Sequence, residues 1–315
     1  MNKKKIFVWS LYDFANSMVS IAFFLYFSQW LVVDRGVWDF WFNITLTIAS
    51  LIFILVGPVL GSIADKTKNK ISGIRATTLI SASLYFLTGV AALSIPDKEF
   101  IATALFILAT ATYLLSFIYY NSFLRDLASP DKQGIVSGWG LFGSYLGQIT
   151  AVIATLPFAT GVITLWGAPG RAQAFIPASI LFLLLALPML ISFKRNKAEE
   201  RQVKISVATE YKSVWKSFVE LVKIPALGRF LLAYFFFNDA VITASNNFPI
   251  YMEKVFGTSD TVKSYVLLGI LVTSALGCII SGWIGDRIGL KKTLMGILAG
   301  WVVIFPLLAA AQSIG

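Results

Sequence analysis

The chain has 315 residues, of which 57% are hydrophobic and 13% charged, with a net charge of +10 and a mean hydropathy of +0.77. Soluble domains usually carry about 25% charged residues, so this composition excludes an ordinary soluble domain and favours an all-α integral membrane protein. Histidine is absent and Cys278 is the single cysteine. These counts exclude Ser-His-Asp and Cys-His catalysis, the usual zinc sites and an intrachain disulfide.

Nine stretches are long and apolar enough to cross a bilayer, because a hydrocarbon core about 30 Å thick needs roughly 20 helical residues. The first follows Lys3-Lys4-Lys5 but is too long for a cleaved signal and has no small-residue cleavage site, so we expect it to be retained. In chain order the predicted spans are residues 6–33, 40–64, 76–96, 100–124, 135–157, 174–193, 229–251, 262–284 and 292–312.

The basic residues alternate with these spans. If the N-terminus is called inside, 21 of the 26 Lys and Arg residues fall in inside segments. This asymmetry is what the positive-inside rule predicts for a cytoplasmic N-terminus. It also accounts for the positive net charge without nucleic acid as a partner.

A long polar connection divides the chain into three parts. We expect a six-helix bundle at residues 1–193, a cytoplasmic linker at 194–228, and the first three helices of a second bundle at 229–315. Apolar residues recur at helical spacing in the linker, which favours an amphipathic helix on the membrane surface. The alternative is a solvated linker with some helix.

The two bundles repeat a motif. Gly61 to Lys70 closes the second span and Gly282 to Lys292 closes the eighth, while Asp13 and Asp239 lie in the first and seventh spans. This is the pattern of a parallel repeat of six helices. The second copy ends after three helices, so we expect nine of twelve spans here, in a truncated reading frame or a fragment.

Six plus six helices, with an acidic-basic loop after the second helix of each half, resemble the major facilitator superfamily. Its signature reads roughly Gly-x-x-x-Asp-Arg-x-Gly-Arg-Lys. The copy at 282–292 matches it well, whereas the copy at 61–70 has Lys66 in place of the Arg and no Gly after Asp65.

Three further segments resemble the vacuole-effluxer-like branch, which includes autophagy-related amino-acid effluxers. They are Trp9-Ser-Leu-Tyr12-Asp13-Phe-Ala-Asn16-Ser17, Tyr120-Asn-Ser-Phe-Leu-Arg-Asp126, and Ser137-Gly-Trp-Gly-Leu-Phe-Gly143-Ser-Tyr-Leu-Gly147. The resemblance implies transport of amino acids or similar metabolites.

Two acidic residues lie well inside predicted spans, where an Asp costs roughly 2.5–3.5 kcal/mol on insertion scales. Each opens a polar stripe at helical spacing. The candidate substrate and proton site is Asp13, Asn16, Ser17, Asp239, Thr243 and Asn246. We expect the stripes to face each other across a cavity near the bilayer midplane. Alternatively, Asp13 pairs with a lysine near the cytoplasmic mouth or braces a neighbouring helix.

Other polar and small residues are secondary candidates. Gln148 and Ser144 lie one turn apart in the fifth span, so they could line the cavity. Tyr119 and Tyr120 belong either to the cavity or to the interfacial aromatic belt, of which the belt is favoured. The glycines of the fifth span predict a packing seam between the two halves.

The repeated signature predicts a cytoplasmic latch that holds the two halves together. An Asp at a helix C-terminus opposes the helix dipole, so Asp65 becomes favourable if it faces the N-terminus of a neighbouring helix or pairs with a cation such as Lys70 or Arg287. The alternative is a plain positive-inside loop. The latch residues are Gly61, Asp65, Lys66, Gly282, Asp286, Arg287 and Lys291.

No Gly-x4-Gly-Lys-Ser/Thr loop is present, so energy would come from a gradient and not from ATP. We expect a monomeric secondary transporter that moves a small polar solute by alternating access, coupled to protons, in a bacterial plasma membrane. No cofactor, metal, nucleic acid or enzymatic activity is expected. The alternatives are a non-transporting scaffold or sensor, a passive channel and an intramembrane enzyme.

Overall fold

The computed structural model describes residues 3–67, 69–94, 99–129, 132–193 and 206–310, with only the backbone described at positions 67, 134, 207, 278, 279, 282, 283, 286 and 290. Within these ranges the chain is helical and has no strand, which confirms the all-α prediction. The elements are α1 (Lys3–Gln29), the π-helical turn η1 (Trp30–Asp34), α2 (Asp39–Thr67), α3 (Lys70–Ser94), α4 (Glu99–Ser122), α5 (Leu124–Leu127), α6 (Gln133–Ala159), the 3₁₀ turn η3 (Arg171–Ala174), α7 (Phe175–Ser192), α8 (Val207–Val222), α9 (Pro225–Phe256), α10 (Asp260–Ile288) and α11 (Leu290–Ala310).

Nine of the described helices are long and apolar enough to cross a membrane, which confirms a multi-pass integral membrane protein. The helices extend further than the hydropathy pattern predicts. In particular, α2 continues to Thr67, so Asp65 and Lys66 lie on its last turn and not in a loop. Contacts divide the chain into two compact units, Met1–Pro225 and Ala226–Gly315, which are described separately below.

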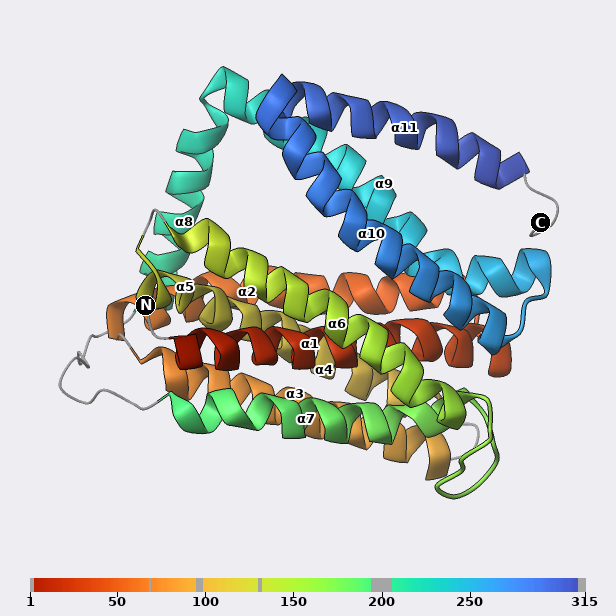
Figure 1. Ribbon diagram of the computed structural model, residues 1–315. Coiled ribbons are helices and arrows are strands. Elements are labelled where there is room, and N and C mark those ends of the chain that lie inside the picture. The colour runs from red at the N-terminus through yellow and green to blue at the C-terminus, as the bar shows by residue number, and fades with distance from the viewer. Residues whose placement is uncertain (1–2, 68, 95–98, 130–131, 194–205, 311–315) are drawn as a thin grey trace. The chain divides into compact units, whose positions relative to one another are not determined.

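Helix α1 lies at the centre of the first unit (Figure 1). It packs against α6 on one side and α7 on another, while α3 packs against α4 and α7, and α2 against α4. Towards the end of α1, closely packed aromatic rings fill the core. The ring centroids of Phe27 and Phe106 are 4.0 Å apart, and those of Phe23 and Tyr85 are 4.4 Å apart. Such pairs contribute beyond their buried area.

Glycines let α6 approach α1 closely. A Cβ added at Gly147 would lie 2.2 Å from the backbone oxygen of Phe14, and one at Gly143 would lie 2.7 Å from that of Ser10. The prediction that these glycines form a seam between the two halves is therefore wrong. They form a seam within the first unit, because the central position of α1 leaves no room for side chains on the α6 face that touches it.

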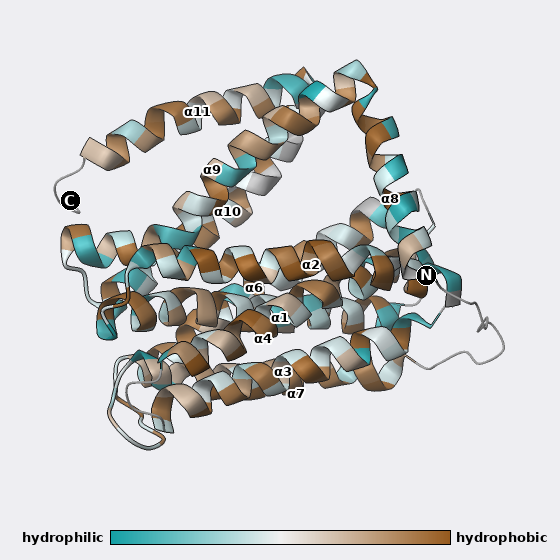
Figure 2. Ribbon diagram, turned by 180° about the vertical axis from the view of Figure 1, so that it is seen from behind, coloured by the Kyte–Doolittle hydropathy of each residue, from teal (hydrophilic) through white to brown (hydrophobic). Residues whose placement is uncertain are grey.

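The outer surface of the first unit is apolar, as the hydropathy colouring of α2 and α3 shows (Figure 2). On α2, Leu51, Ile54 and Leu55 are at least half exposed. Exposed large apolar residues in this density are expected on a surface that faces lipid.

We call the end of the bundle where α1 begins and α2 ends the basic end. Here Arg75 of α3 donates from Nε to the carbonyl of Leu190, at 2.7 Å, and from Nη2 to that of Phe193, at 3.1 Å. The guanidinium therefore caps the C-terminus of α7. At the opposite end, Arg171 forms an ion pair with Asp34.

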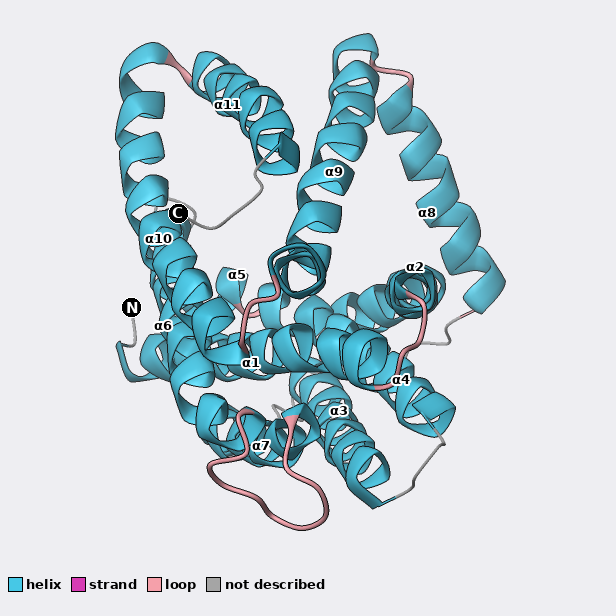
Figure 3. Ribbon diagram, turned by 90° about the vertical axis from the view of Figure 1, so that its right-hand side faces the viewer, coloured by secondary structure: helices cyan, strands magenta, loops and turns pink. Residues whose placement is uncertain are grey.

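Helix α8 belongs to the first unit and crosses the direction of the bundle helices at the basic end (Figures 1 and 3). It contacts α2. Glu210 is its one buried side chain with a described exposure, and nearly all the others are exposed.

The second unit contains α9, α10 and α11. The hydroxyl of Tyr251 on α9 donates to the carbonyl of Leu308 on α11, at 2.7 Å. Lys263 of α10 is 1% exposed and pairs with Glu253 and with Asp260, the latter at 2.7 Å. This buried triad joins the end of α9 to the start of α10.

Candidate functional site

The polar stripe of α1 lies in the core of the first unit. Asn16 is fully buried and Ser17 nearly so, while Asp13 is half-buried. These residues lie on a helix that packs against α6 and α7 and whose Tyr12 side chain contacts Thr78 of α3 and Tyr120 of α4. The stripe is therefore turned towards other helices and not towards lipid, as the sequence predicts for a polar group in a span.

Ser17 of α1 and Gln148 of α6, two predicted site residues, are linked through the hydroxyl of Ser144. The hydroxyls of Ser17 and Ser144 share a hydrogen bond of 2.6 Å, and the amide of Gln148 donates to Ser144 Oγ at 3.3 Å. The network links α1 to α6 at the seam where the glycines allow close approach. Ser144 and Gln148 are half-buried, so this network is partly accessible.

The aromatic rings of Trp9, Tyr12 and Tyr120 stack beside Asp13. The rings of Trp9 and Tyr120 stack with centroids 4.5 Å apart, and the indole N–H of Trp9 donates to the backbone carbonyl of Tyr120 at 3.2 Å. The ring of Tyr12 lies 5.5 Å from that of Tyr120, and its hydroxyl shares a hydrogen bond of 2.6 Å with Thr78. These rings shape the site around the carboxylate.

The interfacial belt predicted for two tyrosines is wrong. Tyr119 is 4% and Tyr120 is 3% exposed, so neither ring reaches a membrane interface. Burial of Tyr120 follows from its stacking on Trp9, which the sequence does not reveal because the two residues are 111 positions apart.

The carboxylate of Asp13 makes no ion pair among the described residues. The hydroxyl of Tyr120 is its polar neighbour from α4. The described residues therefore give no support to the alternative in which Asp13 pairs with a lysine near the mouth. A half-buried carboxylate without a cation is free to take a proton or the positive group of a ligand.

The side chain of Asn16 is also incompletely satisfied. Neither atom of its buried amide meets a hydrogen-bond partner of good geometry among the described residues, although the amide lies beside the hydroxyl of Tyr12. A buried polar group left unpaired costs about 1–3 kcal/mol. Asn16 and Asp13 therefore offer unused hydrogen-bonding capacity one helical turn apart.

The second stripe lies on α9, in the second unit. Asp239 and Thr243 are exposed there and Asn246 is half-buried. The backbone carbonyl of Thr243 accepts a hydrogen bond of 2.9 Å from Asn247. The expected pairing of this stripe with that of α1 across a cavity stays a prediction.

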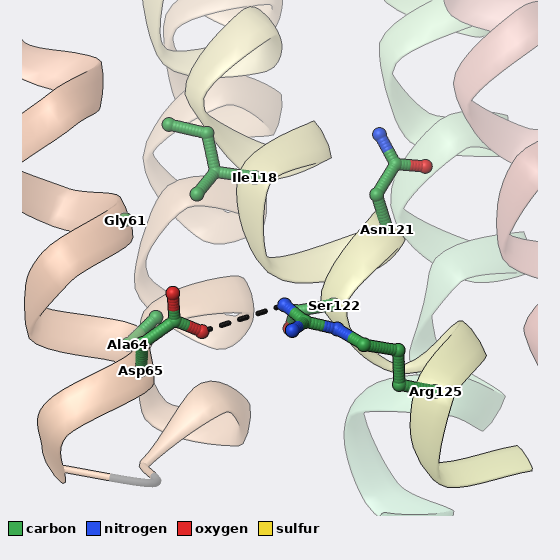
Figure 4. A pocket seen from close by; sticks show the side chains of 7 residues that line it. All are labelled: Gly61, Ala64, Asp65, Ile118, Asn121, Ser122 and Arg125. Carbon is green, nitrogen blue, oxygen red and sulfur yellow. Dashed lines mark ion pairs between the residues drawn. The ribbon is translucent and has the colours of Figure 1, made fainter. Parts of the chain in front are cut away.

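The first signature motif makes its ion pairs within the first unit. Asp65 lies 3.5 Å from Arg125 of α5, and the two groups point towards each other (Figure 4). Lys70, which we expected to pair with Asp65, instead donates to Asp126 at 2.8 Å and to the carbonyl of Ser122 at 3.0 Å. Lys70 begins α3 and therefore faces the C-terminus of α4, where carbonyls and an acid attract it.

A cavity of about 200 Å³ lies between α2 and α4 at this motif. It is lined by Gly61, Ala64, Asp65, Ile118, Asn121, Ser122 and Arg125 (Figure 4). Asp65 and Arg125 bridge the cavity but are both largely exposed. Such an exposed pair stabilises weakly, so it can open and close at little cost.

A residue that sequence reasoning missed completes this end of the bundle. Glu210 of α8 forms an ion pair with Lys66, and Ser62 Oγ donates to Glu210 Oε2 at 2.5 Å. The Lys66 ammonium and the Ser62 hydroxyl hold the pKa of the Glu210 carboxyl below its usual range. Ser62 and Lys66 lie one turn apart on α2, but nothing in the pattern connects them to an acid 144 positions away.

The second signature motif lies at the end of α10, with Arg287 and Lys291 exposed. Only the backbone is described at Gly282 and Asp286. The part of the chain that the structure describes has no group of three or more His, Cys, Asp or Glu side chains that could hold a metal.

Comparison with known proteins places this architecture in a family. Residues 131–311, more than half of the chain, match the family described as vacuole effluxer Atg22 like. The chain is also 28% identical over 318 aligned positions to an uncharacterized MFS-type transporter, YxiO, of Bacillus subtilis (strain 168), covering 94% of this chain and 71% of that protein. The nine apolar helices and the resemblance of the Trp9–Ser17 segment agree with both matches. The chain therefore belongs to the vacuole effluxer Atg22-like family of MFS-type membrane transporters.

Proposed function

We propose that this transporter is a secondary carrier that moves a small polar solute by alternating access, and that Asp13 carries the coupling proton. The observation that supports this most is the half-buried carboxylate of Asp13 inside a membrane-spanning bundle, where it makes no ion pair with any described residue. Such a group is rarely tolerated in a span without a function. The hydroxyl and amide groups beside it supply the neutral hydrogen bonds that a polar solute needs.

Amino acids are the proposed solute class, and efflux is the proposed direction. The family description supports efflux, and the resemblance of the Trp9–Ser17 segment supports amino acids as the solute class. In the N-terminal half, the described residues around Asp13 provide a carboxylate, hydroxyls and an amide. A zwitterion would place its ammonium group near Asp13.

We place the N-terminus in the cytoplasm of a bacterium and the spans in its plasma membrane. The 21 of 26 basic residues on the N-terminal side support this orientation. The proposed cytoplasmic latch between the two halves would form on this side of the membrane from the two signature motifs. Asp65 and Lys66 of the first motif bind partners within the first unit. Alternating access would rock the two six-helix halves around the solute site.

Flux in proteoliposomes tests the proposal. The chain is reconstituted, and uptake of a panel of labelled amino acids is measured with and without an imposed pH gradient. Concentrative uptake that follows the gradient is the expected result. Equilibration without accumulation would indicate a channel, and an absence of flux across the panel would favour a scaffold or sensor.

The role of the second stripe is tested in the same vesicles. Asp239→Asn tests the competing assignment of the proton carrier. If Asp239 carries the proton in place of Asp13, this variant should lose uphill, pH-driven transport and keep solute exchange, because exchange needs the solute site but no net proton movement. Normal pH-driven accumulation by this variant would show that Asp239 does not carry the coupling proton.

A further inference from the structure

We propose that α8 is a docking helix for the anionic lipid surface of the membrane, held at headgroup depth by its bond to the first signature motif. The inference does not depend on which solute is carried. It rests on the position of α8, the composition of its two faces, and the burial of one acidic side chain, Glu210, against α2.

The position of α8 is fixed at its first turn. Glu210 bonds to Ser62 and Lys66, and both lie in the last two turns of α2. The apolar span of α2 ends at Lys66. The start of α8 is therefore held where a membrane-spanning helix leaves the hydrocarbon core, and from there α8 runs across the bundle direction (Figure 3). A helix at this depth and in this direction lies along the bilayer surface.

One face of α8 is apolar and uncovered. Its large side chains, between 37% and 66% exposed, are Tyr211, Val214, Trp215, Phe218, Leu221 and Val222. They recur at three- and four-residue spacing, so they lie along one side of the helix. The rings of Trp215 and Phe218 lie 5.7 Å apart on this side. Trp is favoured at the membrane interface, where an apolar ring body meets the polar headgroups.

The other face carries positive charge. Lys212, Lys216 and Lys223 are exposed, and their spacing places them together opposite the apolar side. Glu220 is an exposed acid on this helix and lies 3.9 Å from Lys216, in an exposed pair of little strength. Glu210 is neutralised by Lys66 and withdrawn from the exposed surface.

The net positive charge of α8 indicates that its apolar face binds an anionic lipid surface. With Glu210 bound to Lys66, α8 presents three exposed lysines and one exposed carboxylate, so the helix is attracted to an anionic surface and not merely to any apolar one. An amphipathic helix with lysines on its polar face and Trp, Phe and Leu on the other binds anionic bilayers. Phosphatidylglycerol headgroups are a suitable anionic surface.

Fluorescence quenching tests the proposal on the full chain. In a Cys278→Ser background, a single cysteine is introduced at Val214 on the apolar face or at Ser213 on the polar face, and labelled with an environment-sensitive dye. The protein is reconstituted in phosphatidylcholine vesicles with or without about 30 mol% phosphatidylglycerol. Quenching by brominated lipid and by aqueous iodide is then measured.

We expect the label at position 214 to be quenched by brominated lipid and shielded from iodide, more strongly with phosphatidylglycerol. The label at 213 should stay accessible to iodide. The triple variant Lys212→Gln, Lys216→Gln, Lys223→Gln should lose the increase caused by phosphatidylglycerol, and the matched triple change to Arg should keep it. Because these lysines are exposed, the variants should fold, which size-exclusion chromatography checks.

Three results would overturn the proposal. Iodide access to position 214 in both vesicles would place α8 in water. Shielding from iodide without quenching by brominated lipid would mean that protein covers this face. Equal lipid quenching in both vesicle types, or no effect of the Lys→Gln triple variant, would exclude recognition of anionic lipid.

Discussion

Ser17 on α1 and Ser144 on α6 share a hydrogen bond of 2.6 Å, and this bond ties the central helix of the bundle to the helix that packs most closely against it. Ser144 also accepts a hydrogen bond from Gln148. One hydroxyl therefore organises the polar groups that two helices bring to the proposed solute site.

Replacing Ser144 by Ala should weaken solute binding more than it weakens the fold. Ser17 and Gln148 both lose a partner, so we expect the KM for transport to rise several-fold. Stability should fall by only about 0.5–1.5 kcal/mol, as for a single hydrogen bond. Transport kinetics in proteoliposomes and thermal unfolding in detergent measure the two effects. Ser137→Ala, two turns earlier on α6, is the matched control, and an equal change in KM there would refute a specific role for Ser144.

Asp13→Asn should uncouple transport from the pH gradient. The amide keeps the size and hydrogen-bonding capacity of the side chain but cannot take up a proton at physiological pH. We expect solute exchange to continue while accumulation driven by a pH gradient is lost. Asp39→Asn, at the start of α2, is the control because an Asn can also occupy a helix N-terminus. If Asp13→Asn still accumulates solute with the gradient, Asp13 does not carry the proton.

Gly147→Ala should separate α1 from α6. The added Cβ would lie 2.2 Å from the backbone oxygen of Phe14, so a helix has to move. Overpacking of this kind costs about 1–3 kcal/mol, and we expect a lower unfolding temperature. Gly138→Ala on the same helix meets nothing within 4 Å, so its unfolding temperature should stay the same or rise, given the better helix propensity of Ala. Equal effects at the two positions would contradict the seam.

The ion pair between Glu210 and Lys66 should break only when the pH is lowered. Lys66 and Ser62 lower the pKa of Glu210 in the folded protein. The ion pair therefore stabilises the folded state at pH values above the pKa of a glutamate in the unfolded chain, which is about 4.3. This contribution is lost only as the pH falls through the lower, folded pKa. A spin label at an introduced cysteine in place of Thr209 should therefore become mobile only at more acidic pH than an ordinary glutamate requires.

In the Glu210→Gln variant the same label should be mobile across the whole pH range, because the charge that holds Lys66 is absent. A loosening of α8 at or above the ordinary range of a glutamate would argue that another group controls it. Lys66→Arg retains a cation at this position and serves as the control.

Hydropathy and charge asymmetry were sufficient to predict the spans, because crossing lipid imposes a length and a composition that local sequence must satisfy. The same constraint singled out Asp13, whose position in a span is costly. The ion pairs were harder to predict. Asp65 had Lys70 close by in sequence, yet it pairs with Arg125, because Lys70 at the start of α3 bonds to the end of α4.

Contacts between distant segments account for the other differences. The burial of Tyr120 depends on Trp9, and the glycines of α6 fit α1 of their own unit. Small residues in a span predict close packing but do not identify the partner helix. Glu210 could not be assigned a partner from its own segment, since an acid in the first turn of any helix is already explained by the helix dipole.

The cap that Arg75 places on α7 has a consequence for biogenesis. The last carbonyls of the sixth span are satisfied by a side chain from the third, 115 and 118 positions earlier. The end of α7 can therefore settle only after the third span is already in place. A change at Arg75 should therefore leave insertion of the six spans intact and weaken the docking of the end of α7 against α3.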